Sequence, residues 1–226
     1  MNAAPLVQLD GVSLTRDGGF TLSVDGLSIA PGEAVACVGP SGCGKTTLAH
    51  LVAGILLADT GNARLDGHEL AALTEDRRRA LRITTIGMVF QRFALLDHLT
   101  GLENVLLPYH VSDELDLTDG AEERARGLAH TLGVAARLDA RPERMSQGER
   151  QRLAICRALV TRPALLIADE PTGNLDPARS DETIELLVSQ AREHDVALFV
   201  VTHDHGLLEH FDRILTVDDQ GSVAAR

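Results

Sequence analysis

The spacing of hydrophobic and polar residues changes several times along this chain, and each change marks a different kind of element. Residues 6–30 alternate loosely between apolar and polar positions and are interrupted by glycines, which predicts short antiparallel strands joined by turns. Later apolar runs predict buried strands at 34–38, 86–90, 164–168, 197–202 and 214–217. Helical spacing lies between them, at 46–55 and from the Asp176–Pro177 pair onward. Strands that alternate with helices predict a mainly parallel sheet covered on both faces.

The pattern differs between residues 92 and 160, where strand signals disappear. Apolar positions recur at helical spacing in 119–132, where Asp119 and Glu122 predict a capping box, and again in 149–160. We therefore predict a single α/β domain over 1–226. Its core with an N-terminal antiparallel β edge would comprise 1–91 and 161–226, and 92–160 would form an inserted helical sub-domain.

Composition narrows the possible functions. The 226 residues contain 21 Lys+Arg and 33 Asp+Glu, and the resulting net charge of −12 disfavours nucleic-acid binding, which requires a basic surface. No apolar run approaches the roughly 20 residues that span a bilayer, and no signal-peptide pattern is found at the start. Three cysteines without paired spacing fit a reducing compartment. These features predict a cytoplasmic globular protein.

A glycine-rich turn after the strand at 34–38 carries the most specific motif. Residues 39–46 match G-x-x-x-x-G-K-[ST] at every fixed position, between a strand and a helix as the motif requires. The glycines let N–H groups surround phosphate oxygens, the helix adds its dipole, and Lys45 brings a charge to the β- and γ-phosphates. This predicts a P-loop NTPase whose triphosphate site comprises Gly39, Pro40, Ser41, Gly42, Cys43, Gly44, Lys45, Thr46 and Thr47.

Cys43 leaves two interpretations open. A thiol at a helix N-terminus beside Lys45 is in surroundings that favour the reactive thiolate. Alternatively, cysteine stands there because it is small enough to fit the loop.

Two carboxylates follow the strand at 164–168. Asp169 would hold Mg²⁺ together with the Thr46 hydroxyl, and Glu170 could orient and deprotonate an attacking water. In isolation the pair could equally form a solvated acidic turn. Beside a phosphate loop, the catalytic interpretation is favoured.

A third motif precedes the helix at 149–160. Ser146 and Glu149 have the spacing of a capping box, which by itself indicates only that a helix begins there. A capped helix N-terminus that also carries Gly148 can, in addition, bind a phosphate.

The order of these motifs resembles that of ABC-type ATPases. The phosphate loop is followed by Gln91, the 146–149 motif, the acidic pair, Asp176 and His203, and the resemblance covers about residues 6–218. Segments at 90–96, 102–108 and 169–176 are similar to the ATP-binding subunits of lipoprotein-release and macrolide-export systems.

The resemblance implies a homodimer in the ATP-bound state. Two subunits would sandwich two ATP molecules, and Asp176 would lie at their boundary. Each ATP would contact the phosphate loop of one subunit and, in the other, Ser146, Gln147, Gly148 and Glu149. Glu170 would be the general base, His203 would bond the γ-phosphate, and Gln91 would touch both Mg²⁺ and the attacking water. The magnesium ligands would thus be Thr46, Gln91 and Asp169.

The resemblance further implies that ATP hydrolysis powers a membrane exporter. The chain would sit peripherally on the inner face of the cell membrane, with its helical sub-domain against a permease that is a separate polypeptide. The family often has an aromatic residue near 15–16 to stack on adenine; this chain has Thr15 and Arg16, so Phe20 or the Arg16 guanidinium are the candidates. The alternative is a non-transport ABC ATPase, such as a cell-division regulator or an iron–sulfur assembly ATPase. A GTP-dependent switch is disfavoured because the Asn-Lys-x-Asp guanine motif is absent.

Overall fold

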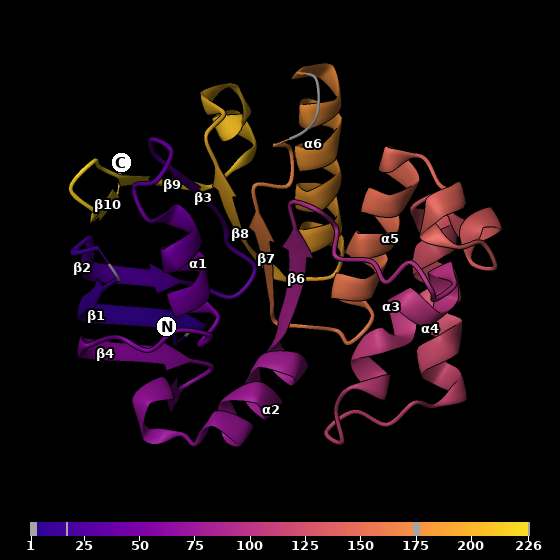
Figure 1. The fold of residues 1–226 in the computed structure, drawn as a ribbon, viewed down its shortest axis with the longest axis horizontal. Coiled ribbons are helices and arrows are strands. Elements are labelled where there is room, and N and C mark those ends of the chain that lie inside the picture. Colours follow the sequence, from indigo (N-terminus) through magenta and orange to yellow (C-terminus); the bar gives the residue numbers. More distant parts are fainter. Residues whose placement is uncertain (1–3, 17, 174–176, 226) are drawn as a thin grey trace.

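A single mixed sheet forms the centre of the molecule (Figure 1). The computed structural model describes residues 4–16, 18–173 and 177–225. Over these residues the strand order is β5-β4-β1-β2-β10-β9-β3-β8-β7-β6. The strands are β1 (Val7–Thr15), β2 (Thr21–Ile29), β3 (Ala34–Val38), β4 (Thr60–Leu65), β5 (His68–Glu69), β6 (Ile86–Phe90), β7 (Leu165–Asp169), β8 (Ala197–Thr202), β9 (Arg213–Val217) and β10 (Ser222–Ala225).

The two parts of this sheet differ in strand direction. The neighbours β6, β7, β8, β3 and β9 all pair in parallel. At the other end, β2, β1, β4 and β5 pair antiparallel. Strand β10 joins the parts, parallel to β2 and antiparallel to β9. The predicted fold class, a mainly parallel core with an antiparallel N-terminal edge, is confirmed.

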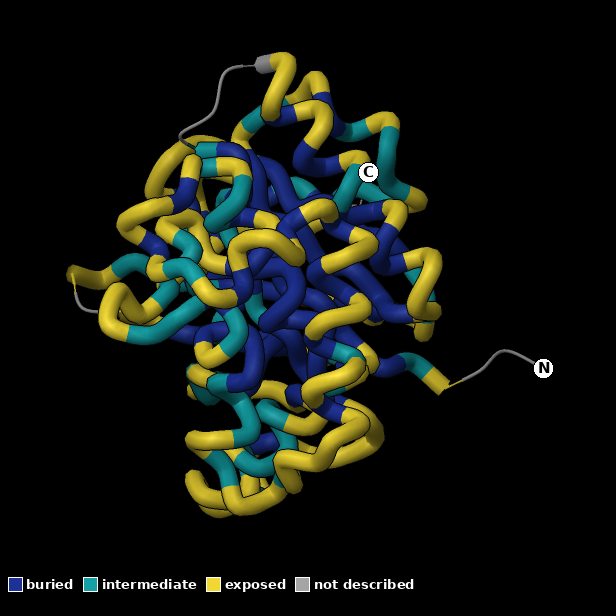
Figure 2. The backbone as a smooth tube through the Cα atoms, turned by 90° about the vertical axis from the view of Figure 1, so that its right-hand side faces the viewer, coloured by how far each residue is buried: buried dark blue, intermediate teal, exposed yellow. Residues whose placement is uncertain are grey.

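Six α-helices are described: α1 (Lys45–Val52), α2 (Glu75–Thr85), α3 (Gly101–His110), α4 (Asp119–Thr131), α5 (Gln147–Leu159) and α6 (Pro177–Glu193). Helices α3, α4 and α5 pack on one another and gather at the side of the molecule away from β1, β2 and β4 (Figure 1). Seen from that side, buried positions lie in the middle and exposed ones around them (Figure 2). Within the described residues, none of the helices is both long and apolar enough to cross a bilayer.

The core strands are buried on both faces, and each face packs against different helices. On β7, Leu165 and Ile167 belong to the cluster that contains the apolar residues of α1. The alternate residues Leu166 and Ala168 belong to the cluster that contains those of α5 and α6. Since side chains alternate along a strand, α1 and α5 lie on opposite faces of the sheet.

Two differences from the sequence predictions have clear physical causes. The predicted capping box at Asp119 is wrong, because the Thr118 hydroxyl caps α4 and Asp119 is the first helical residue. An acidic residue in the first turn still interacts favourably with the helix dipole, so the two positions look alike in sequence. Strands β4 and β5 were not predicted, because they are largely exposed and an apolar pattern is missing there.

Candidate functional site

The loop between β3 and α1 forms a cradle around the Lys45 ammonium group. The Nζ atom donates hydrogen bonds to the carbonyl oxygens of Gly39 at 2.8 Å and Pro40 at 2.7 Å. The lysine is only 5% exposed, although its ammonium lies at the loop. Helix α1 begins after Gly44 without a side-chain cap and without an acidic residue in its first turn. Its first N–H groups and its dipole therefore favour an anion at this end.

Glycine is required at two points of this loop because neighbouring atoms come very close. A Cβ on Gly39 would lie 2.3 Å from the Val217 carbonyl oxygen. Gly44 has a φ of 100°, in the left-handed region, and a Cβ there would lie 2.9 Å from the Phe20 ring. The loop is thus held between the end of β9 and Phe20, which fixes its course.

The same contacts decide between two of the sequence hypotheses. The Cys43 side chain is 3% exposed, and its Sγ lies within 2.8 Å of a Cβ built on Gly39, so the thiol packs in the core. The structure therefore favours the interpretation that cysteine is small enough to fit. The Phe20 ring packs against both Gly44 and Gly221, so the far end of the ring is already occupied by packing contacts. Arg16 is exposed.

The acidic residues at the end of β7 lie beside the start of α1. The Thr46 hydroxyl donates to the Asp169 carboxylate at 3.1 Å. Burial raises the pKa of Asp169, while the hydrogen bond from Thr46 lowers it and opposes that effect. A hydroxyl and a carboxylate next to a phosphate-binding loop are the oxygen donors that Mg²⁺ prefers, so the residues present fit that ion.

Three side chains predicted to be catalytic gather at the carboxyl ends of β6, β7 and β8. Glu170 Oε2 lies 3.7 Å from His203 Nδ1, and the His203 side chain is 55% exposed. A Cβ on Gly173 would lie 2.6 Å from the Gln91 amide nitrogen and 3.4 Å from Glu170 Oε2, so these two groups flank the same glycine. The three strands are parallel neighbours, and their carboxyl ends therefore share one edge of the sheet, where ligands bind in folds of this kind.

The segment that follows Gln91 is held by residues that sequence reasoning missed. Phe93 and Ala94 have φ values of 61° and 48°, a conformation that costs a non-glycine residue roughly 1–2 kcal/mol. The guanidinium of Arg157, on α5, donates to both of their carbonyl oxygens. A signal existed in the sequence, since Arg157 interrupts an otherwise apolar stretch of α5.

The start of α5 is closed by its own side chains. The Ser146 hydroxyl accepts from the Glu149 N–H at 3.3 Å, and Glu149 Oε2 accepts from the Ser146 N–H at 2.7 Å, so the predicted capping box is confirmed. Glu149 Oε1 also accepts from Arg137 Nε at 2.6 Å. Arg137 lies in the short helix η2 (Ala135–Arg137). Its guanidinium, together with the Ser146 hydrogen bonds, lowers the pKa of the Glu149 carboxyl to about 2.

The phosphate loop and the start of α5 are not brought together within one chain. Gly39, Pro40 and Ser41 line a cavity of about 410 Å³ that His203 also lines. Ser146, Gln147 and Gly148 line a different cavity of about 290 Å³ beside α6. The two helices pack on opposite faces of the sheet, which explains the separation. The predicted boundary residue Asp176 lies outside the described residues.

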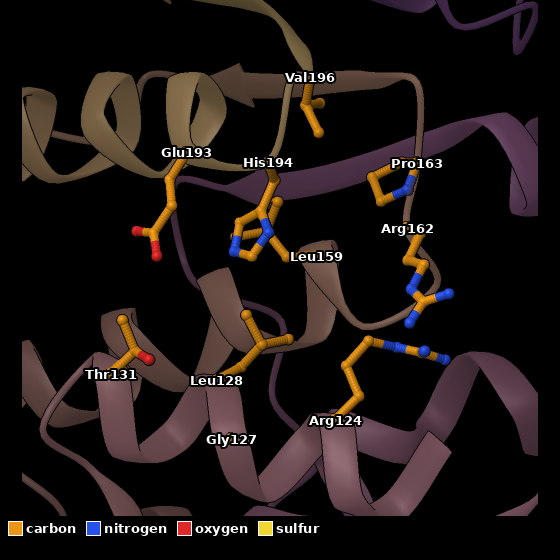
Figure 3. A pocket seen from close by; sticks show the side chains of 10 residues that line it. All are labelled: Arg124, Gly127, Leu128, Thr131, Leu159, Arg162, Pro163, Glu193, His194 and Val196. Atoms are coloured by element: carbon orange, nitrogen blue, oxygen red, sulfur yellow. The ribbon is translucent and has the colours of Figure 1, made fainter. Parts of the chain in front are cut away.

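A further cavity of about 540 Å³ lies between α4, the end of α5 and the end of α6 (Figure 3). Arg124 and Arg162 lie at one side of it and Glu193 at the other, with Leu128, Leu159 and Val196 among its apolar lining (Figure 3). None of the predicted site residues that the structure describes belongs to its lining. The volume of a cavity therefore does not identify the functional site in this protein, whereas the chemistry of the residues that line it does.

Comparisons with known proteins agree with this geometry. The family described as ABC transporter matches residues 22–173. The lipoprotein-releasing system ATP-binding protein LolD of Roseobacter denitrificans is 37% identical over 219 residues, which cover 95% of this chain and 96% of that protein. The macrolide export ATP-binding/permease protein MacB of Syntrophobacter fumaroxidans is 40% identical over 193 residues, which cover 85% of this chain and 27% of that protein.

A solved structure extends the likeness to the whole fold. The dimeric post-hydrolysis state of the ATP-binding cassette MJ0796, bound to ADP and Pi, superimposes with a TM-score of 0.82 at 30% identity. The match covers 97% of this chain and 97% of that one.

Proposed function

This chain belongs to the ABC transporter family, as an ATP-binding subunit that hydrolyses ATP, and from that premise we propose that two copies of it close around ATP to drive a membrane exporter. The relatives that release lipoproteins or export macrolides, according to their names, indicate the kind of exporter. The proposal of a dimer rests on one observation: the phosphate loop and the Ser146 end of α5 lie on opposite faces of one sheet. A single chain therefore cannot place both on one triphosphate, and a second copy can.

In each copy, the phosphate loop binds the triphosphate. The Lys45 ammonium uses two of its three N–H donors on loop carbonyls, which leaves a third for the β- and γ-phosphates. The uncapped start of α1 adds its N–H groups, and residues Gly39–Thr47 form the loop that contacts the phosphates. The residues that would hold Mg²⁺ are Thr46, Asp169 and Gln91, and the bound ion would neutralise charge that develops on the phosphate oxygens.

The attacking water is positioned from the edge of the sheet. Glu170 accepts its proton, and Gln91, across Gly173 from that carboxylate, orients it. His203, 3.7 Å from Glu170 and at the cavity beside the phosphate loop, donates to the γ-phosphate. The partner copy completes the site with Ser146, Gln147, Gly148 and Glu149, and Asp176 lies at the boundary. Arg16 is the candidate for stacking on adenine, because Phe20 is used in packing.

We assign the helical sub-domain, residues 92–160, to contact with a permease on the inner face of the membrane. A groove of about 340 Å³ lies between α2, β6, α3 and α5. Val111 and Phe90, which line it, are 66% and 37% exposed. Co-purification of the chain from membranes with a membrane-spanning protein would support this assignment. Recovery without any such protein would favour the alternative, a non-transport ABC ATPase acting in cell division or iron–sulfur assembly.

Glu170→Gln tests the catalytic and dimer proposals together. The amide keeps the size of the side chain but cannot take a proton, so turnover falls by about 10²–10⁴ while ATP still binds. The closed dimer then accumulates, because ATP binding favours it and hydrolysis no longer ends it. Molar mass in solution, measured with ATP, with ADP and without nucleotide, should show a dimer only with ATP.

A second substitution, Ser146→Arg, places a bulky cation where the partner's phosphate loop must approach. Added to Glu170→Gln, it should abolish the ATP-dependent dimer, whereas Ser189→Arg, at an exposed site on α6, should not. A double variant that still dimerises would show that Ser146 is only a helix cap. A Glu170→Gln variant that binds ATP at millimolar concentration and stays monomeric would contradict dimerisation by the chain alone.

A further inference from the structure

We infer that Arg157 is a positioning residue, which ties the helix that starts at Ser146 to the loop that carries Gln91. The inference rests on the proposed function, because it assigns Arg157 a role in hydrolysis through Gln91. Arg157 itself lies in the last turn of α5 and is placed in none of the roles described above.

The guanidinium of Arg157 is buried, and its two terminal nitrogens donate hydrogen bonds to two consecutive backbone carbonyls. Its Nη1 donates to the Ala94 oxygen at 2.6 Å and its Nη2 to the Phe93 oxygen at 2.5 Å. The residue is 9% exposed, and burial lowers its pKa. Within the described part of the chain no carboxylate forms an ion pair with it. Removing a cation from water costs free energy. We therefore assign this buried guanidinium the role of holding the loop whose carbonyls it contacts.

The two carbonyls belong to a strained turn that begins directly after Gln91 and Arg92. Both Phe93 and Ala94 have left-handed backbone, and neither is glycine. Such a conformation persists only where the surrounding structure enforces it. Local backbone hydrogen bonds, from the Phe93 N–H to the Phe90 carbonyl and from the Ala94 N–H to the Arg92 carbonyl, close the turn. The paired hydrogen bonds from Arg157 add the side-chain contacts, and they fix the direction of both peptide groups.

The other end of the loop is anchored separately. Asn104, fully buried on α3, accepts from the Leu96 N–H at 2.7 Å and donates to the Leu96 carbonyl at 3.0 Å. It also donates to the carbonyls of Leu99 and Thr100. The segment from 93 to 100 is therefore held at two places. Gln91 directly precedes this anchored segment, and its side-chain amide lies beside Gly173.

Helix α5 thus joins two parts of the ATP site. Ser146 caps one end of this continuous helix, and Arg157 lies near its other end, about 16 Å along the axis. Any displacement of α5 when a partner's ATP meets Ser146 reaches the Gln91 loop through Arg157. Arg157 and Phe90 also line the groove assigned to the permease, so an occupant of that groove acts on the same tether.

Arg157→Lys tests the tether, because it keeps the charge but loses the planar fork that bonds two carbonyls at once. We expect kcat to fall about ten- to hundredfold through misplacement of Gln91, with the KM for ATP unchanged within about twofold. In a Gln91→Ala background the same substitution should cause no further loss, since the residue it positions is already gone.

Arg124→Met is the matched control. Arg124 also holds backbone with its guanidinium, since it donates to the Val160 carbonyl at 2.6 Å and to the Tyr109 hydroxyl at 2.9 Å. Neither of these partners belongs to the Gln91 loop. It should lower thermal stability without changing kcat. Equal losses of kcat from both arginine variants, or a full loss from Arg157→Lys in the Gln91→Ala background, would overturn the inference.

A fluorescence measurement separates failure of the tether from failure of the proposed function. The chain contains no tryptophan, so Phe93→Trp introduces a single reporter into the turn. Adding Arg157→Lys should increase quenching of this tryptophan by acrylamide, and adding Arg124→Met should not. Unchanged quenching would refute the tether whatever the activity shows. Full turnover of Gln91→Ala alone would refute the role of Gln91 and leave the quenching result to decide on the tether.

Discussion

The two helix N-termini proposed to contact ATP, those of α1 and α5, are built in opposite ways. Helix α1 begins after Gly44 in left-handed backbone, with no side-chain cap and with Lys45 as its first residue. Helix α5 begins after Ser146 in extended backbone, with a complete capping box and with Glu149 in its first turn. The first end is open and basic. The second is closed by its own carboxylate, which Arg137 also holds.

This difference separates what one chain does alone from what a dimer does. An uncapped start that carries a cation binds an anion without rearrangement, so the α1 end supplies the affinity of a single copy for the triphosphate. At the α5 end, a phosphate must compete with hydrogen bonds that already satisfy the helix. Such an end contributes only when a partner brings the phosphate to it. The proposed function therefore predicts that the chain binds ATP first and dimerises afterwards.

Lys45→Ala should have the largest effect, because it removes the cation from the open end. Turnover should fall below about 1% of the unmodified protein, and ATP affinity should weaken by at least about tenfold. Titration calorimetry and a phosphate-release assay measure these. Lys45 is the only lysine in the 226 residues, so ATP should also protect the single lysine side chain from an acylating reagent. ATP affinity within twofold of the unmodified protein would place the phosphates elsewhere.

Glu149→Gln should have a smaller effect, on stability rather than on ATP binding by one copy. The folded pKa of Glu149 is about 2, below its ordinary 4.5, so the carboxylate stabilises the fold above pH 4.5 and loses this contribution as the pH falls toward 2. The melting temperature of the variant should therefore be lower at pH 7, and the difference should shrink as the pH is lowered from 5 to 3.

The exposed pair of Glu122 and Arg126 on α4 provides the control for this measurement. Glu122→Gln removes a carboxylate from another helix start but leaves the starts of α1 and α5 intact. Its melting temperature should follow that of the unmodified protein across the same pH range. A Glu149→Gln variant whose stability loss does not depend on pH would contradict the proposed closure of the α5 end.

Cys43 should show the smallest effect, although it lies inside the open loop. Its thiol packs in the core, so Cys43→Ser should keep turnover within about twofold, and labelling of the native protein should be slow with or without ATP. Burial also raises the pKa of Cys37 and Cys156 to about 12, which keeps these two thiols unreactive until unfolding. Fast labelling that ATP blocks would mean that the thiol faces the phosphates instead.

Elements with a strong apolar pattern were predictable, and polar ones were not. Strands β3, β6 and β8 have the predicted bounds, because each is a short apolar run in the parallel part of the sheet. Helix α2 and strand β4 bury few side chains, so their positions depend on contacts with distant segments. The choice of Thr118 over Asp119 as the cap of α4 depends on a one-residue difference in where the helix starts.

The phosphate loop and the acidic pair follow from the order of residues, because their chemistry depends on spacing of a few positions along the chain. The roles of Arg157, Arg137 and Asn104 do not, since each bonds to groups that lie 63, 12 and 8 positions away. The separation of α1 from α5 depends on which face of the sheet each helix covers. Strand alternation sets up two faces locally, but only packing assigns a helix to each face. That assignment is the reason for proposing that a partner supplies the second half of the ATP site.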